Sequence, residues 1–105
     1  MAVGRGTVAF ANVVVNVDSI VAEDVTLNTA CSVDRDCAVG AHAHLAPASI
    51  ISGGVRIGEG AFLGIGMVAL PGVAVGAWAI VGAGAVVTAD VRPGATVVGV
   101  PAREV

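Results

Sequence analysis

Side chains that could do chemistry are few in this chain of 105 residues, which has two histidines, two cysteines, five arginines and no lysine. Histidine exchanges protons near neutral pH, so His42 and His44 are the candidate general bases. Arg35, flanked by Asp34 and Asp36, keeps its charge at any ordinary pH and cannot accept a proton. It could instead pair with its two neighbours or bind an anion such as a carboxylate or a phosphate. Two histidines fall short of a three-histidine zinc site, and we expect no metal.

The composition excludes several classes of protein. Val, Ala and Gly supply 57 of the 105 residues, whereas Trp, Phe and Tyr together supply three, too few for a conventional core. The net charge of −3 offers no basic surface for a nucleic acid, and high hydrophobicity with low charge argues against disorder. Two cysteines cannot build a disulfide scaffold, and no secretory signal opens the chain. We therefore expect a cytoplasmic protein that binds no nucleic acid.

Residues 61–87 carry no charge and are long enough to cross a bilayer as a helix. The same stretch contains six glycines and Pro71, and it lacks basic flanks and an aromatic belt. A different periodicity explains these residues better, so we expect no membrane span.

Aliphatic residues recur at every sixth position from Val3 to Val87 without exception. Four positions further on in each hexad, a second series runs from Thr7 to Val91 and contains only small or medium-sized, uncharged residues. Between Val3 and Val98, no charged side chain falls in either series. A period of six fits neither an α-helix nor a simple alternating strand. It predicts a short strand and a turn repeated every six residues, with both series facing inward.

The turn between two strands needs residues that tolerate a left-handed backbone. In most hexads the position before the second series, from Gly6 to Asp90, holds Gly, Asn or Asp. Three such corners close a triangle, so about eighteen residues make one coil. The sequence therefore predicts an all-β protein, a parallel β-helix of five to six triangular coils in a single domain of residues 1–105. The repeats are expected over about residues 3–98, with a slip in register at Pro93 and a tail at 99–105.

The two repeat series also predict where the cysteines and the large apolar residues lie. Cys31 and Cys37 fall in the inward series, which predicts that they are core residues and neither a metal pair nor a disulfide. Large apolar residues at outward or corner positions indicate an interface between copies of the chain. These residues are Phe10, Phe62, Leu70, Trp78 and Ile80.

Several motifs resemble the hexapeptide-repeat acetyltransferases, and most closely the group of sialic-acid O-acetyltransferases and bacillosamine-pathway sugar N-acetyltransferases. The motifs are NTACSVDRDC at 28–37, HLAP at 44–47, GGV at 53–55, and VGAGAVV at 81–87 followed by GVPAR at 99–103. The resemblance implies a left-handed helix and a homotrimer, with acetyl-CoA bound in the groove between neighbouring copies. Members of the group usually carry an N-terminal Rossmann-like domain that holds the nucleotide sugar, and we expect this domain to be missing here.

The resemblance assigns roles to particular residues. Arg35 stands where the family has the histidine that takes the proton from the acceptor, and Asp36 matches the acidic residue that orients this histidine. Asn28 matches an active-site asparagine, and His44 matches the histidine that contacts acetyl-CoA near the thioester. By position in the family pattern, we expect backbone contacts to the coenzyme at Gly53, Ile65 and Ala83, and a contact to a coenzyme phosphate at Arg103.

Two functions follow from this pattern. In the first, the chain is an acetyl-CoA-dependent acetyltransferase, or the catalytic domain of one, acting on an amino or hydroxyl group of a sugar or nucleotide sugar. Its activity would be impaired because Arg35 replaces the base. In the second, the chain is a trimeric β-helical module without catalytic activity. Because Arg35 and His44 fall on different edges of the predicted prism, one site can contain both only if neighbouring copies each supply one.

Overall fold

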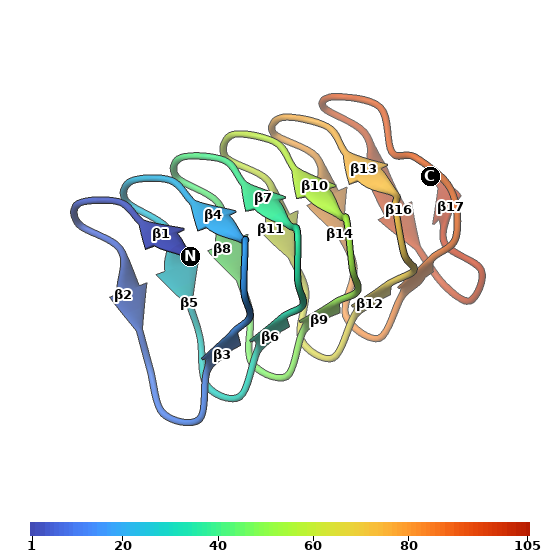
Figure 1. The fold of residues 1–105 in the computed structure, drawn as a ribbon. Coiled ribbons are helices and arrows are strands. Elements are labelled where there is room, and N and C mark those ends of the chain that lie inside the picture. The colour runs from blue at the N-terminus through green and yellow to red at the C-terminus, as the bar shows by residue number, and fades with distance from the viewer.

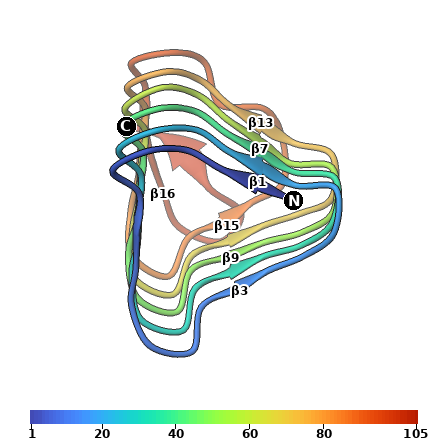
Figure 2. The same ribbon diagram turned by 60° about the vertical axis from the view of Figure 1, so that its left-hand side comes forward.

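The computed structural model describes residues 1–105, and the chain winds into a parallel β-helix whose coils stack along one axis (Figure 1). In a view turned toward that axis, the coils have a triangular outline (Figure 2). The structure consists of strands and turns, and it has no helix that could cross a membrane. The all-β, parallel β-helical fold that the period of six predicts is therefore confirmed.

The prism has three faces, each a stack of short parallel strands. Face 1 contains β1 (Ala2–Val3), β4 (Ile20–Val21), β7 (Ala38–Val39), β10 (Arg56–Ile57) and β13 (Ala74–Val75). Face 2 contains β2 (Val8–Ala9), β5 (Thr26–Leu27), β8 (His44–Leu45), β11 (Phe62–Leu63), β14 (Ile80–Val81) and β16 (Thr96–Val98), with β17 (Arg103–Glu104) added antiparallel to β16. Face 3 contains β3 (Val14–Val15), β6 (Ser32–Val33), β9 (Ile50–Ile51), β12 (Val68–Ala69) and β15 (Val86–Val87).

Up to β15, successive strands on a face pair residues eighteen apart, as Ile20 does with Ala38, whereas β14 and β16 pair residues sixteen apart. Face 2 has one more parallel strand than the other two faces, so the chain makes five full coils and part of a sixth. We name the turns by the faces that they join: corner 1–2, corner 2–3 and corner 3–1.

The two inward series form one continuous core of aliphatic residues. Leu45, Leu63 and Met67 are fully buried, and the same holds for nearly every inward residue from Ser19 onward. In the first coil Val3 remains 51% exposed, because no earlier coil covers it. A chain with almost no aromatic residues therefore still buries a core, because the interior of the prism is narrow enough for Val, Ile, Leu and Ala to fill.

The corners adopt the left-handed backbone that their composition predicts. Every corner position from Gly6 to Gly84 has a positive φ, including four corners that hold other residue types: Ala30 (60°), His42 (63°), Ala48 (60°) and Trp78 (61°). This conformation is unfavourable for such residues, and the stacking of the coils imposes it. The N–H of Trp78, for example, donates to the carbonyl of Glu59 on the preceding coil at 2.8 Å.

The predicted slip in register at Pro93 begins earlier than the sequence indicates. Val91 forms a bridge with Val75, a separation of sixteen residues where the regular coil has eighteen. The corner before Val91 is thus two residues short, and the backbone N–H of Ala74 loses its regular carbonyl partner. The carboxylate of Asp90 replaces that partner, accepting the hydrogen bond at 2.9 Å. The six-residue period does not predict this shortened corner, because a side-chain oxygen accepts the hydrogen bond in place of a backbone carbonyl.

Candidate functional site

Arg35 and Asp36 lie on corner 3–1, in the turn between β6 and β7. The Nε–H of Arg35 donates to Oδ2 of Asp36 at 3.3 Å, and the backbone N–H of Arg35 donates to Oδ1 of Asp34 at 2.8 Å. The two side chains of the ion pair are 63% and 57% exposed. Both terminal amino groups of Arg35, Nη1 and Nη2, make no hydrogen bond within the chain. The turn thus presents a fixed carboxylate and a guanidinium that still has free donors.

On the next coil, the two positions above Arg35 and Asp36 hold glycines, Gly53 and Gly54, and on the coil after that Gly72 follows Pro71 at the same corner. Gly53 stacks on Arg35, and a Cβ added to it would meet the carbonyl oxygen of Arg35 only at 3.7 Å. At Gly54 an added Cβ would have one neighbour, the Cα of Gly72 at 3.9 Å, and at Gly72 it would have none within 4 Å. We call Gly53, Gly54 and Gly72 the glycine ledge. A ligand can approach the backbone closely there, because no side chain stands in the way.

His44 lies on face 2, on β8, and is half-buried. Its imidazole packs beside the phenyl ring of Phe62, which pairs with it on β11, with the ring centroids 5.1 Å apart and the planes inclined by 38°. The aromatic neighbour restricts the rotamers open to the imidazole and leaves its other side facing outward.

The other candidate coenzyme residues lie on the same side of the prism as His44. Asn28, Ile65 and Ala83 belong to corner 2–3, and Arg103 lies on β17 at the C-terminal end of face 2. The amide oxygen of Asn28 accepts a hydrogen bond from the backbone N–H of Thr29 at 2.8 Å, which fixes the side chain over its own turn. Ile65 is 60% exposed, and Ala83 is also exposed.

A single chain therefore does not bring the predicted site residues together. It holds them in two groups on different sides of the prism: Arg35, Asp36 and Gly53 on corner 3–1, and Asn28, His44, Ile65, Ala83 and Arg103 on face 2 and corner 2–3. The other candidate base, His42, belongs to neither group. It lies on corner 1–2, where its Nδ1 is 3.8 Å from Oδ2 of Asp24.

The two cysteines are core residues, as their place in the inward series predicts. Both are buried and neither forms a disulfide. Burial raises the pKa of the Cys31 thiol to about 11 and also raises the pKa of Cys37. The Cys37 thiol donates to the carbonyl of Ser52 at 3.1 Å. Because the thiolate is the reactive form, neither side chain is a nucleophile near neutral pH.

Sequence reasoning missed a structural role for inward hydroxyl groups at the corners. Ser19 Oγ donates to the carbonyl of Asp34 at 2.6 Å and accepts from the N–H of Cys37 at 3.2 Å. Thr7 makes the equivalent pair of bonds on corner 1–2. Ser19 thereby ties both ends of the turn that carries Arg35 to the preceding coil. A polar residue inside an otherwise apolar series was the signal for this role.

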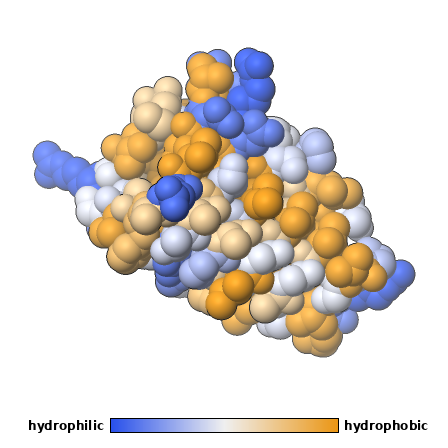
Figure 3. Space-filling view, turned by 90° about the horizontal axis from the view of Figure 1, so that it is seen from below, coloured by the Kyte–Doolittle hydropathy of each residue, from blue (hydrophilic) through white to orange (hydrophobic).

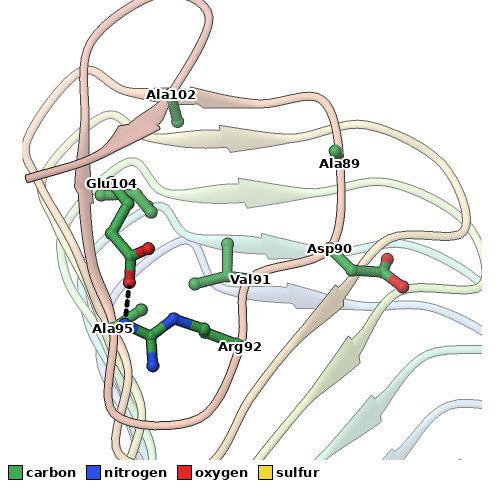
Figure 4. A pocket seen from close by; sticks show the side chains of 8 residues that line it. Ala89, Asp90, Val91, Arg92, Ala95, Ala102 and Glu104 are labelled. Atoms are coloured by element: carbon green, nitrogen blue, oxygen red, sulfur yellow. Dashed lines mark ion pairs between the residues drawn. The ribbon is translucent and has the colours of Figure 1, made fainter.

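The one cavity in the structure lies elsewhere, at the C-terminal end of the prism (Figure 4). It has a volume of about 210 Å³, and an ion pair at its edge joins Arg92 and Glu104 at 2.6 Å. The lining residues are Ala89, Asp90, Val91, Arg92, Ala95, Val97, Ala102 and Glu104. None of the predicted site residues borders it. No three His, Cys, Asp or Glu side chains lie close enough together to hold a metal ion.

Solved structures resemble this chain closely. PerB from Caulobacter crescentus, in complex with CoA and GDP-perosamine, is 44% identical with a TM-score of 0.96, over 99% of this chain and 54% of that one. The acetyltransferase domain of PglB from Neisseria gonorrhoeae, in complex with acetyl coenzyme A, is 38% identical with a TM-score of 0.97, over 99% and 51%. A galactoside acetyltransferase in complex with coenzyme A shares the fold alone, at 20% identity and a TM-score of 0.82 over 99% and 63%.

No protein-family model and no curated protein matches the chain. The chain spans about half the length of the PerB and PglB structures. Those matches cover nearly all of its own coils, at identities well above what a shared fold alone produces. The chain is therefore a left-handed β-helix of hexapeptide repeats, similar along nearly all of its length to the β-helical part of these sugar N-acetyltransferases.

Proposed function

We propose that this chain is the acetyl-CoA-dependent acetyltransferase domain of an enzyme that acetylates a nucleotide sugar. One observation carries the proposal: 99% of the chain matches, at 44% identity, a structure in complex with CoA and GDP-perosamine. The match to the PglB acetyltransferase domain, which binds acetyl coenzyme A, supports the same coenzyme. The acceptor is a sugar amine or hydroxyl, and the N-acetyltransferases among the relatives favour the amine.

The proposed active site is shared between neighbouring copies in a homotrimer. Arg35 and Asp36 from one copy would meet His44 and Asn28 from the next, because one chain holds these pairs on different sides. Exposed apolar side chains support such an assembly, since apolar residues cover much of the surface (Figure 3). The larger ones include Phe10, Ile20, Ile50, Phe62, Ile65, Trp78 and Ile80. Exposed apolar area on this scale is typical of a surface that another copy covers.

The coenzyme would lie along corner 2–3, in the seam between copies. The pantetheine arm carries amides, and this corner offers backbone groups beside small side chains such as Ala83. Ile65 would contact its apolar segments. His44 would lie near the thioester, and Arg103 would bind a coenzyme phosphate. Gly53 would border the acceptor from the neighbouring copy, because it lies on the corner of Arg35. The free, buried thiols are consistent with a reducing, cytoplasmic setting.

One observation favours a second candidate, a trimeric β-helical module that binds coenzyme or nothing and has no catalytic activity. Arg35 cannot accept a proton, and it stands where the family resemblance places the base. On this alternative, the prism that the chain shares with the similar structures would serve assembly or binding alone.

Isothermal titration calorimetry with acetyl-CoA, followed by an assay of acetyl transfer to GDP-perosamine, tests the proposal on the native chain and on Arg35→His. We expect both proteins to bind acetyl-CoA and Arg35→His to transfer the acetyl group faster than the native chain. Binding without transfer in either protein would favour the second candidate. If neither protein binds acetyl-CoA and Arg35→His gains no activity, the proposed function is wrong.

A further inference from the structure

The proposed acetyl transfer needs a proton acceptor, and the structure limits which side chains near corner 3–1 can be that acceptor. The guanidinium of Arg35 stays protonated. His42 lies on corner 1–2, away from corner 3–1. In the proposed trimer His44 of the next copy comes to this corner, but its imidazole packs against Phe62 and is assigned to the thioester. On the coil of Arg35 and on the coil before it, this corner offers three carboxylates that can accept a proton: Asp18, Asp34 and Asp36.

The contacts of these carboxylates differ. Oδ1 of Asp34 already accepts two hydrogen bonds, from the backbone N–H of Arg35 at 2.8 Å and from Nδ2 of Asn16 at 3.4 Å, so Asp34 shapes the turn. Asp18 lies one coil away and makes no bond to Arg35. Asp36 has one oxygen held by the Nε–H of Arg35 at 3.3 Å, while its other oxygen, Oδ1, accepts no hydrogen bond in the chain.

The approach to Asp36 is open as well. Its side chain is 57% exposed, and the glycine ledge begins on the next coil of the same corner. A substrate that lies on Gly53 and Gly54 therefore meets no side chain between itself and the Arg35–Asp36 pair. The ion pair orients the carboxylate, and the backbone N–H of Asp36 holds the turn by donating to the carbonyl of Val17 at 3.2 Å.

We infer that Asp36 is the proton acceptor of the acetyl transfer, with Arg35 as the positioning residue that fixes its carboxylate; this inference rests on the proposed function. The acceptor nitrogen forms a bond to the carbonyl carbon of the thioester, and the bond between that carbon and the coenzyme sulfur breaks. The nitrogen loses one proton to Oδ1 of Asp36. Asp36 then releases its proton to solvent and the departing coenzyme thiolate takes one up from solvent, so an amine and acetyl-CoA give an amide and the free thiol of CoA.

A carboxylate in this role selects the class of acceptor. A carboxylate is a weak base, so it assists a sugar hydroxyl or water, whose proton must leave during attack, less well than it assists an amine. An amine attacks with its own lone pair, and its N–H becomes acidic once nitrogen is bonded to the carbonyl carbon. Asp36 can accept that proton. The acceptor that this base favours is therefore an amino sugar, with transfer to a hydroxyl slower.

The decisive variant is Asp36→Asn. Asn tolerates the left-handed backbone of this position, where φ is 60°, and keeps an oxygen that can accept from Arg35, but it cannot take a proton. We expect acetyl transfer to GDP-perosamine to fall about 100-fold in kcat, the scale of general-base catalysis. Binding of acetyl-CoA by calorimetry should be unchanged. The matched control is Asp18→Asn, which makes the same substitution at the same corner one coil earlier, with φ of 61°, and should transfer at the native rate.

A second readout needs no sugar. Slow hydrolysis of bound acetyl-CoA also requires a proton acceptor, and the CoA thiol released can be followed with a thiol reagent. We expect the native chain to exceed Asp36→Asn about tenfold. Equal rates in the two proteins, for transfer and for hydrolysis, would overturn the role of Asp36 while leaving the proposed function in place. Bound acetyl-CoA that is neither transferred nor hydrolysed above the buffer rate would also overturn it. A native chain that fails to bind acetyl-CoA would instead contradict the proposed function.

The pH profile separates a proton acceptor from a merely structural residue. The charged groups around Asp36 are Arg35 and Asp34 on its corner, Asp18 on the preceding coil, and Arg56, which pairs with Ala38 on face 1. The next coil contributes Ser52, Gly53 and Gly54 at this corner, none of which is charged. The native chain would use the carboxylate of Asp36 as base, whereas Arg35→His would use the new histidine. Between pH 7.5 and pH 5.5, about the range in which a histidine becomes protonated, kcat/KM of the variant should therefore fall more steeply than kcat/KM of the native chain. Parallel profiles would contradict the assignment.

Discussion

His44 and Phe62 form a ring pair on adjacent strands of face 2, with centroids 5.1 Å apart. Because the proposed site places the imidazole near the thioester, we expect His44→Ala to weaken acetyl-CoA binding about tenfold, the equivalent of about 1.4 kcal/mol. Calorimetry at fixed pH measures the change. An unchanged affinity would remove His44 from the site. Phe62→Leu is the matched control: it keeps an apolar outward side chain on β11 but frees the imidazole, so its loss of affinity should be smaller.

The trimer can be tested by a charge on face 2. Ile80 is 47% exposed and points outward from β14, so a lysine there does not disturb the core. We expect the native chain to have about three times its own mass of 10.2 kDa in solution, and Ile80→Lys to lower that mass because it places a charge in the interface. Light scattering coupled to gel filtration gives both masses, and circular dichroism checks the fold. A folded variant that stays trimeric would place the interface elsewhere.

The close stacking of coils makes certain glycines irreplaceable. A Cβ on Gly40 would lie 2.7 Å from the backbone nitrogen of Glu59 on the next coil, and backbone cannot move aside cheaply. We expect Gly40→Ala to destabilise the fold by about 3 kcal/mol, at the upper end of overpacking. Gly53→Ala is the control, since its Cβ would meet nothing closer than 3.7 Å. Urea denaturation of both variants compares them, and equal midpoints would contradict the predicted spacing of the coils.

Most of the fold could be predicted because every coil needs the same inward aliphatic positions and the same corners, at the same spacing. The six-residue period identifies inward positions such as Leu45 and Cys31, and the residues between them identify the corners. Corners such as Trp78 could not be identified from residue type, because their left-handed backbone is imposed by a hydrogen bond from the neighbouring coil. The early slip in register was invisible for a similar reason, since it depends on one carboxylate, that of Asp90.

The candidate site was less predictable than the fold. The sequence places Arg35 and His44 on different edges, and the structure confirms that separation. The sequence does not predict the hydrogen bond between Arg35 and Asp36, because these two residues are adjacent in the chain and their side chains could equally have pointed apart. The inward hydroxyl of Ser19 is an ambiguous signal for its role in holding this turn, because the hydroxyl of Ser49, at another inward position, makes no hydrogen bond.

The buried thiols make the free energy of unfolding fall at alkaline pH. Burial raises the pKa of Cys31 to about 11 and raises that of Cys37, whereas an unfolded cysteine titrates near about 8.5. Above that pH the unfolded chain releases protons that the folded chain retains, so stability falls as the pH rises toward 11. With no lysine and no tyrosine in the chain, few other groups titrate in this window. We expect a lower urea midpoint at pH 10 than at pH 7.5, and a smaller difference in Cys31→Ala; an identical difference would show that Cys31 does not cause it.

Asp90 provides the last test, because its carboxylate takes the place of a backbone carbonyl in the shortened corner. Asp90→Ala would leave the N–H of Ala74 without its partner at 2.9 Å. Because Asp90 and its hydrogen bond are exposed and water can take the place of the lost partner, we expect a loss of no more than about 1 kcal/mol in the free energy of unfolding, at the low end for an unpaired donor. Asp90→Asn keeps the accepting oxygen and should retain most of the stability. If both variants lose the same amount, the charge of Asp90, and not its hydrogen bond, holds the slipped coil in register.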